Sequence, residues 1–199
     1  MRPDAILAFD TSAAHCAAAF LCNGRVVTKV EPMAKGQAER LAPMVSALLI
    51  EASVGWRDVS AIGVGTGPGN FTGIRIAVAF ARGLALGLGI PAVGVTGFEA
   101  VAHAYPDAAR PFTVTLPAPR GQLYVQRFDP MAGEAGLVDA GAVFGPVHAL
   151  ADLPLDHFVS AIAKVARFKS QDAQPRPKPF YLRGAAAAPP SDPAPVILP

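Results

Sequence analysis

The sequence predicts an α/β fold built on a mixed sheet, and three observations support this prediction. Asn23-Gly24, a dipeptide typical of tight β-hairpins, separates two short apolar runs near the start of the chain. Apolar residues then recur with helical spacing from Leu41 to Ala52. Further on, a glycine-rich segment from Gly65 to Arg75 joins a strand-like run to a long helical one. Strands that give way to alternating helices and strands are typical of α/β proteins.

The first half of the chain is expected to hold most of this layout. Pro43 should lie in the first turn of the first helix, which then begins no earlier than about Arg40. Thr72 is expected to cap the second helix. The expected order is strands at 5–10, 16–21 and 25–30, a helix at 40–52, a strand at 59–65, a helix at 72–88, a strand at 91–95 and a short helix at 97–104.

The pattern weakens after residue 104 and predicts a second, smaller lobe. Two strands at 112–116 and 123–128 flank a proline-containing turn, and a helix follows at 156–168. From residue 170 onward, frequent prolines exclude a helix or a central strand. The expected division is an N-terminal lobe at 1–104, a shortened second lobe at 105–169 and a proline-rich tail at 170–199.

Composition and charge favour a cytoplasmic globular protein. The chain has 17 basic and 15 acidic residues, and this near-neutral balance does not predict strong electrostatic binding to nucleic acid. The longest apolar region contains Arg75, Arg82 and Pro91. It is therefore expected to form a buried helix followed by a strand, and not a membrane span. Cys16 and Cys22 would lie about 20 Å apart on one strand, too far for a disulfide.

The glycine-rich turn has two possible uses. Its glycines permit backbone conformations that other residues avoid, and it leads into the start of a helix. Free amide groups at a helix start suit an anion such as a phosphate. The same glycines also suit close packing against the backbone of a partner. The apolar helix that follows the turn favours the partner.

Four segments resemble motifs of the bacterial TsaB family, also called YeaZ. They are Phe9-Asp10-Thr11-Ser12, Gly67-Pro68-Gly69-Asn70-Phe71-Thr72-Gly73-Ile74-Arg75, Arg40-Leu41-Ala42-Pro43-Met44 and Tyr181-Leu182-Arg183. The resemblance implies an actin-like ATPase fold (ASKHA, ribonuclease H-like) with two lobes. It also implies a part in forming threonylcarbamoyl adenosine at position 37 of tRNAs.

The resemblance also implies particular partners. TsaB-like proteins are the non-catalytic partner of a catalytic paralogue, TsaD, and bind it through the two helices of the N-terminal lobe. An ATPase, TsaE, joins that pair, and tRNA is reached through the complex. An unused partner helix tends to pair with its own copy, so the chain alone is expected to form a homodimer.

The chain departs from the family pattern in three places. Gln37 stands where many relatives carry histidine, and Pro117-Ala118-Pro119-Arg120-Gly121-Gln122 replaces a more polar segment. The second lobe is short and lacks a clear glycine-rich loop between residues 144 and 168. In actin-like folds such a loop holds the adenosine, so we expect no bound cofactor in the isolated chain and ATP only in complex with partners.

No catalytic or metal site is expected. The histidines at 15, 103, 148 and 157 fall in separate elements, and no histidine has another three or four residues away. Asp10 is the one carboxylate with a mechanistic precedent, as a magnesium organiser, and its alternative role is an Asx-turn. A vestigial nucleotide site would comprise Asp10, Thr11, Ser12, Gly67 and Gly69. The alternative functions are an actin-like phosphotransferase and, with less support, a glycoprotease-like peptidase.

The long helix at 72–88 is apolar on more than one side. Either it is buried on two sides within the protomer, or it exposes a face to a partner; the resemblance favours the partner. The expected interface residues are Ile74, Arg75, Val78 and Arg82 on this helix and Leu41 and Val45 on the preceding one. Val78→Glu is accordingly expected to abolish partner binding.

Overall fold

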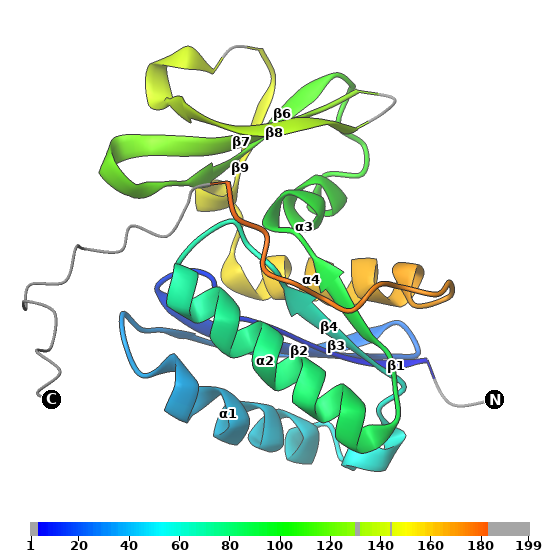
Figure 1. Ribbon diagram of the computed structural model, residues 1–199. Helices are drawn as coiled ribbons and strands as arrows, with labels where there is room; N and C mark the ends of the chain where they lie inside the picture. Colours follow the sequence, from blue (N-terminus) through cyan, green and yellow to red (C-terminus); the bar gives the residue numbers. More distant parts are fainter. Residues whose placement is uncertain (1–3, 130–131, 144, 183–199) are drawn as a thin grey trace, which may run out of the picture.

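A five-stranded mixed sheet is the larger of two sheets in the computed structural model, which describes residues 4–129, 132–143 and 145–182 (Figure 1). Its strand order is β3-β2-β1-β4-β5. The first three strands pair antiparallel, and β1, β4 and β5 pair parallel. The strand bounds are β1 (Ala5–Asp10), β2 (His15–Cys22), β3 (Arg25–Pro32), β4 (Ala61–Gly65) and β5 (Ala92–Val95).

Helices cover both faces of this sheet. On one face lie α1 (Gln37–Glu51) and α2 (Phe71–Leu88), which run side by side, and on the other lies α4 (Leu155–Lys169) (Figure 1). Because successive side chains of a strand point to opposite faces, β1 is apolar throughout. Leu7 and Phe9 pack with α1 and α2, and Ile6 and Ala8 pack with α4.

A smaller, four-stranded sheet lies beyond one end of the first (Figure 1). Its order is β8-β7-β6-β9, with β6 (Phe112–Pro117), β7 (Gln122–Phe128), β8 (Ala132–Asp139) and β9 (Val147–Ala149). The short helix α3 (Gly97–Ala104) contacts both this sheet and α4. The two sheets therefore share one hydrophobic core through α3 and α4.

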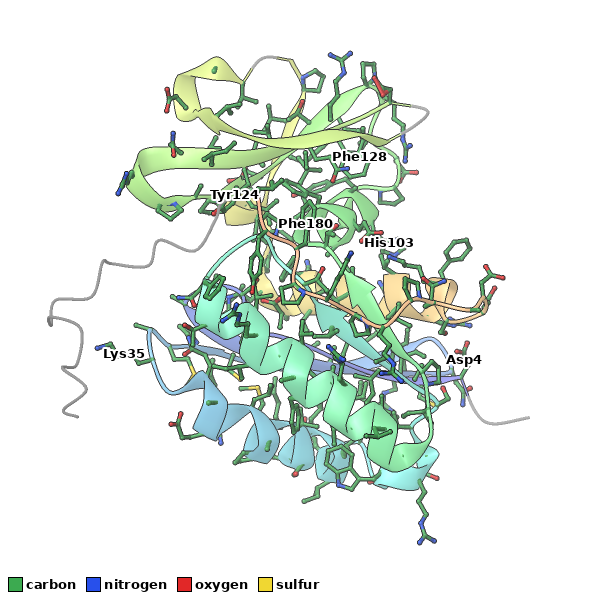
Figure 2. The ribbon with its side chains drawn as sticks, viewed as in Figure 1. Asp4, Lys35, His103, Tyr124, Phe128 and Phe180 are labelled. Atoms are coloured by element: carbon green, nitrogen blue, oxygen red, sulfur yellow. The ribbon has the colours of Figure 1, made fainter. Side chains whose placement is uncertain are left out.

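Residues 174–182, here called the C-terminal strap, return along the body of the protein after α4. The Phe180 amide donates to the Thr66 carbonyl at 2.8 Å. The Phe180 side chain is labelled in Figure 2. Its ring packs edge-on against Phe98, with 6.4 Å between ring centroids. Pro177 is buried. The strap thus packs as part of the fold, and the rest of the expected tail, 183–199, lies outside the described residues.

The expected α/β layout with a mixed sheet is confirmed, with two changes in the helices. First, α1 begins at Gln37, earlier than expected, so Pro43 lies inside it. The proline is tolerated because it and Glu39, whose carbonyl loses its helical donor, are both exposed to water. Second, Asn70 caps α2, not Thr72: the Asn70 Oδ1 accepts from the Gly73 amide at 2.9 Å.

The division into lobes also differs from the expected one. The helix expected at 156–168 in the second lobe is α4, and it packs on β1, β2 and β4 of the first sheet. Its buried side chains, among them Phe158 and Ile162, fill the face that α1 and α2 leave open. The residues that follow the smaller sheet therefore complete the N-terminal lobe.

Candidate functional site

The glycine-rich turn packs against the turn between β1 and β2. A Cβ at Gly73 would lie 1.9 Å from the Thr11 carbonyl oxygen, and one at Gly69 would lie 2.2 Å from that of Ser12. The Asn70 amide donates to the Ser12 carbonyl at 2.6 Å, and the Thr11 hydroxyl donates to the Gly73 carbonyl at 2.7 Å. Close backbone packing is seen here, but the packed backbone belongs to the same chain and not to a partner, which corrects that expectation.

Asp10 lies at the end of β1 and is only 1% exposed. Its Oδ1 accepts hydrogen bonds from the Ser12 amide at 2.9 Å and the Ser12 hydroxyl at 2.8 Å, and lies 2.7 Å from His15 Nε2. Burial raises the pKa of Asp10, but the bonds from His15 and Ser12 outweigh it and hold that pKa below its usual value. The contact with Ser12 is the Asx-turn expected from the sequence.

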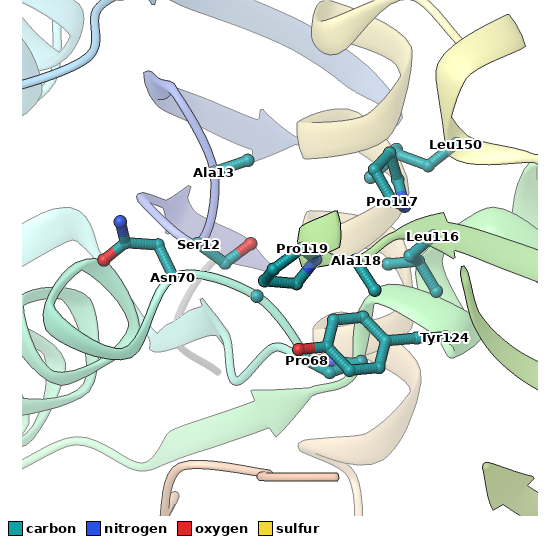
Figure 3. Close-up of a pocket in the computed structure, with 11 residues that line it drawn as sticks. Ser12, Ala13, Pro68, Asn70, Leu116, Pro117, Ala118, Pro119, Tyr124 and Leu150 are labelled. Carbon is teal, nitrogen blue, oxygen red and sulfur yellow. The ribbon is translucent and has the colours of Figure 1, made fainter. Parts of the chain in front are cut away.

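A pocket of about 300 Å³ lies between the turn at Ser12 and the smaller sheet (Figure 3). Ser12 and Gly69 line it, whereas Asp10, Thr11 and Gly67 do not. The Tyr124 ring and the segment from Leu116 to Pro119 form the opposite wall. No charged side chain is among the lining residues. The expected nucleotide-site residues therefore lie near one another, but they do not form a single charged cradle.

The titratable side chains are dispersed. Within the described part of the chain, no three His, Cys, Asp or Glu side chains are grouped closely enough to hold a metal ion. His15 is paired with Asp10, and His148 stacks on Tyr105 with 4.2 Å between ring centroids. Both histidines thus have structural contacts of their own.

Four of the six expected interface residues are buried within the protomer, which corrects that prediction. Leu41, Val45 and Ile74 are at most 1% exposed, and Val78 is 4% exposed. They pack between the helices and the first sheet, so they cannot touch a partner. A glutamate at position 78 would therefore disrupt the core, and Val78→Glu is not a test of partner binding.

Arg75 and Arg82 do lie on the exposed side of α2, as expected. The expected interface residues did not include Ala79, Gly83 and Leu86, although these share the exposed side of the helix with Arg75 and Arg82 at helical spacing. Leu86 is 83% exposed and Ile50, on α1, is 77% exposed. We call this surface the α1/α2 outer face; it consists of the exposed residues Ala38, Glu39, Ala42, Pro43, Ala47, Ile50 and Glu51 of α1 and Thr72, Arg75, Ala79, Arg82, Gly83, Leu86 and Gly87 of α2.

By length and composition alone, α2 could span a membrane, and among the described residues it is the one helix that could. In the structure it covers the first sheet and buries Ile74, Ala77, Val78 and Ala81 there. Its apolar character is therefore divided between a core side and the outer face.

The chain is similar to proteins that are described by a part in tRNA modification. The family model described as TsaD, tRNA N6-adenosine threonylcarbamoyltransferase, matches residues 31–188. The TsaB protein of Escherichia coli, described as a tRNA threonylcarbamoyladenosine biosynthesis protein, is 37% identical over 98 residues. The structure of YeaZ from Pseudomonas aeruginosa superposes with a TM-score of 0.75 at 27% identity, over 89% of this chain and 99% of that one.

The chain belongs to the TsaB (YeaZ) family. The TsaB protein of Haemophilus influenzae is also similar, with 34% identity over 99 residues. In each of these two sequence matches the alignment covers about half of this chain and 42% of the TsaB protein. The matched YeaZ structure and the TsaD model establish the actin-like α/β fold.

Proposed function

We propose that the chain is a non-catalytic component of threonylcarbamoyladenosine formation at position 37 of tRNAs. In this proposal it binds a TsaD-type transferase through the α1/α2 outer face. The exposed apolar side chains of that face, Leu86 above all, are the observation that carries the proposal. The pathway is supported by the description of its TsaB relatives as tRNA threonylcarbamoyladenosine biosynthesis proteins.

The composition of the outer face favours a helical partner. Ala79 and Gly83 on α2, with Ala42 and Ala47 on α1, are small and exposed, so another helix can approach closely. Fully burying a side chain such as Leu86 stabilises an association by about 1.5–3 kcal/mol. The neighbouring helices thus offer one continuous surface to the helices of a partner.

A non-catalytic role is supported by what surrounds Asp10. Its Oδ1 is engaged by His15 and Ser12, and its Oδ2 lies against Gly65, so close that a Cβ there would be 1.8 Å away. A magnesium organiser needs a carboxylate open to the ligand. In this proposal a TsaE-like ATPase and the tRNA join through the transferase, in the cytoplasm, and no nucleotide binds the isolated chain.

The same face would pair with its own copy when the transferase is absent. Mass measured by light scattering during gel filtration is expected to correspond to a dimer at high concentration. Leu86→Glu should shift that mass toward the monomer, and adding the transferase should replace the homodimer by a heterodimer. A monomer at every concentration would contradict this part of the proposal.

The test of the proposal is partner binding by Leu86→Glu. Titration calorimetry with the TsaD-type protein of the same organism is expected to show loss of binding, because a carboxylate replaces an apolar contact. Phe168→Glu is the matched control, since Phe168 is also a large exposed apolar residue, 73% exposed, but lies on α4 across the sheet. It should bind normally. In a strain depleted of its own TsaB, the control should restore the tRNA modification and Leu86→Glu should not.

The alternative of a phosphotransferase draws on the pocket beside Ser12 and Gly69, which lies between the two sheets. Titration with magnesium and ATP tests it: tight binding by the chain alone, lost in Asp10→Ala, would favour an enzyme. We expect no binding, because no charged side chain lines the pocket. A peptidase has no comparable support.

A further inference from the structure

Arg75, on the α1/α2 outer face, is held in place by two aromatic rings. Its guanidinium carbon lies 3.8 Å from the centroid of the Phe71 ring, one helical turn earlier. Its Nε donates a hydrogen bond to the Tyr181 hydroxyl at 3.0 Å. The rings of Phe71 and Tyr181 are themselves stacked, with centroids 4.8 Å apart and an interplanar angle of 27°. An exposed arginine is thus fixed by the C-terminal strap.

The guanidinium is fixed without being neutralised. Within the described residues Arg75 forms no ion pair, and its one hydrogen bond, to Tyr181, uses Nε. The terminal nitrogens therefore remain for another group, and their fork matches the two oxygens of a carboxylate. Because the side chain is already immobilised, less rotamer entropy is lost when it binds.

The charge on the α2 side of the outer face favours an acidic partner there, while Glu39 and Glu51 lie on the α1 side. The sequence of α2 contains Arg75 and Arg82 and no acidic residue. The two arginines are separated by two helical turns, about 10 Å along the axis. At the far end of α2 a pocket of about 570 Å³ is lined by Arg82 and by Arg176 of the strap, with no acidic side chain in its lining. The strap therefore contributes Tyr181, which contacts Arg75 near the start of α2, and the charge of Arg176 near its end.

We propose that Tyr181 positions Arg75 as a preformed anchor for a carboxylate on the TsaD-type partner. The inference rests on the proposed function and adds a residue outside the two helices to the binding surface. Arg75 binds the partner directly, and Tyr181 is a positioning residue that acts through Arg75. The matching partner surface is a helix with small residues and with acidic side chains placed to meet Arg75 and, two turns on, Arg82.

A double-mutant cycle on the full-length chain tests the inference, with calorimetric Kd values for the TsaD-type protein of the same organism. Tyr181→Phe keeps the stacked ring and removes the acceptor of the Arg75 bond. It should raise Kd about 2- to 10-fold. Arg75→Ala should raise Kd by about 10- to 100-fold and make binding less sensitive to salt. In the Arg75→Ala background, Tyr181→Phe should have no further effect, because its role is exerted through the arginine.

Two controls accompany the cycle. Tyr105→Phe removes a hydroxyl from a tyrosine that stacks on His148, away from α2, and should leave Kd unchanged. Arg75→Lys keeps the charge without the fork and should bind more weakly than the unmodified chain but better than Arg75→Ala.

Three outcomes would overturn the inference. In the first, Tyr181→Phe leaves Kd unchanged. In the second, Tyr181→Phe weakens binding equally with and without Arg75, which would mean that Tyr181 contacts the partner directly. Arg75→Ala could also leave the protein pair intact and weaken only the retention of tRNA by the assembled complex, which would assign the arginine to RNA. Leu86→Glu distinguishes failure of the anchor from failure of the proposed function. If it abolishes binding and the Arg75 and Tyr181 variants do not, only the anchor is wrong. If none of these variants affects binding, the proposed function is wrong as well.

Discussion

Gly69, in the turn before α2, and Gly73, in the first turn of α2, each lie against a backbone carbonyl oxygen. The carbonyl oxygens of Thr11 and Ser12 occupy the positions where side chains at Gly73 and Gly69 would begin. Backbone atoms of a buried strand end cannot move aside as a flexible side chain can. The glycines are therefore required by contact with β1 and its turn.

Gly73→Ala is expected to lower the free energy of unfolding by about 1–3 kcal/mol, because the new methyl group meets the Thr11 carbonyl. Gly83→Ala is the matched change on the same helix, where a Cβ meets nothing within 4 Å. It should stabilise the protein by about 0.5–1 kcal/mol through helix propensity. Urea unfolding of both variants measures the difference, and equal effects would contradict this account of Gly73.

Asp10 is expected to make the free energy of unfolding depend on pH in the acidic range. Its pKa is lowered in the folded state from an ordinary value of 3.8. The unfolded chain therefore binds the proton more readily, and the stabilisation is complete above pH 3.8 and is lost as the pH falls through the folded-state pKa. Asp10→Asn should be less stable than the unmodified chain near pH 7, and the gap should narrow below pH 3.8. Denaturant titrations at several pH values measure it. Asp152→Asn, at an exposed position, is the control, and a gap that does not change with pH would contradict the prediction.

At the scale of elements, α2 is a helix with apolar residues on two sides, one buried against the first sheet and one exposed to water. Ile74 and Val78 bury one side against the first sheet, while Leu86 stays in water. Sequence periodicity alone does not tell the buried side of α2 from its exposed side, because the apolar residues Ile76, Phe80 and Leu84 lie half-buried between the two. The two sides can be told apart only when the position of the sheet is known. Four of the six residues expected at an interface therefore lie on the buried sides of α1 and α2, and Arg75 and Arg82 lie on the exposed side of α2.

The start of α2 provides a second test at this scale. Asn70→Ala should lower the free energy of unfolding by about 1 kcal/mol, because the Gly73 amide loses its acceptor. Thr72→Ala should change it little, since Thr72 lies exposed in the first turn. Thermal unfolding of the two variants compares the caps directly. A larger effect at Thr72 would restore the cap expected from the sequence.

At the scale of the whole molecule, the C-terminal strap joins parts that are distant in the chain. Phe180 bonds to Thr66 at the end of β4 and packs on Phe98 of α3. Nearby, Lys169 at the end of α4 donates to the Gly94 carbonyl at 3.0 Å and to Glu99 at 2.9 Å. The region after α4 is thus an integral layer of the protein.

Phe180→Ala is expected to destabilise the protein by about 1–3 kcal/mol, less than a fully buried phenylalanine would, because the ring is half-buried. Phe168→Ala removes the same side chain at a position that is 73% exposed and should have an effect near zero. Urea unfolding of both variants provides the comparison. Equal effects would mean that the strap contributes little to the stability of the fold.

In the first half of the chain the sequence by itself determined the order and type of the elements, from the hairpin at Asn23-Gly24 to the helical spacing after Leu41, because these follow from local periodicity and turn chemistry. It also determined that the turn before α2 needs glycines, and it offered two roles for Asp10, of which the structure contains the Asx-turn. It did not predict β8 and β9 of the smaller sheet. Only the tertiary structure decided what those glycines face, on which sheet α4 lies, and which side of α2 meets water. The physical reason is that these features depend on contacts between distant segments, such as Thr11 with Gly73 and Arg75 with Tyr181, which no local pattern encodes.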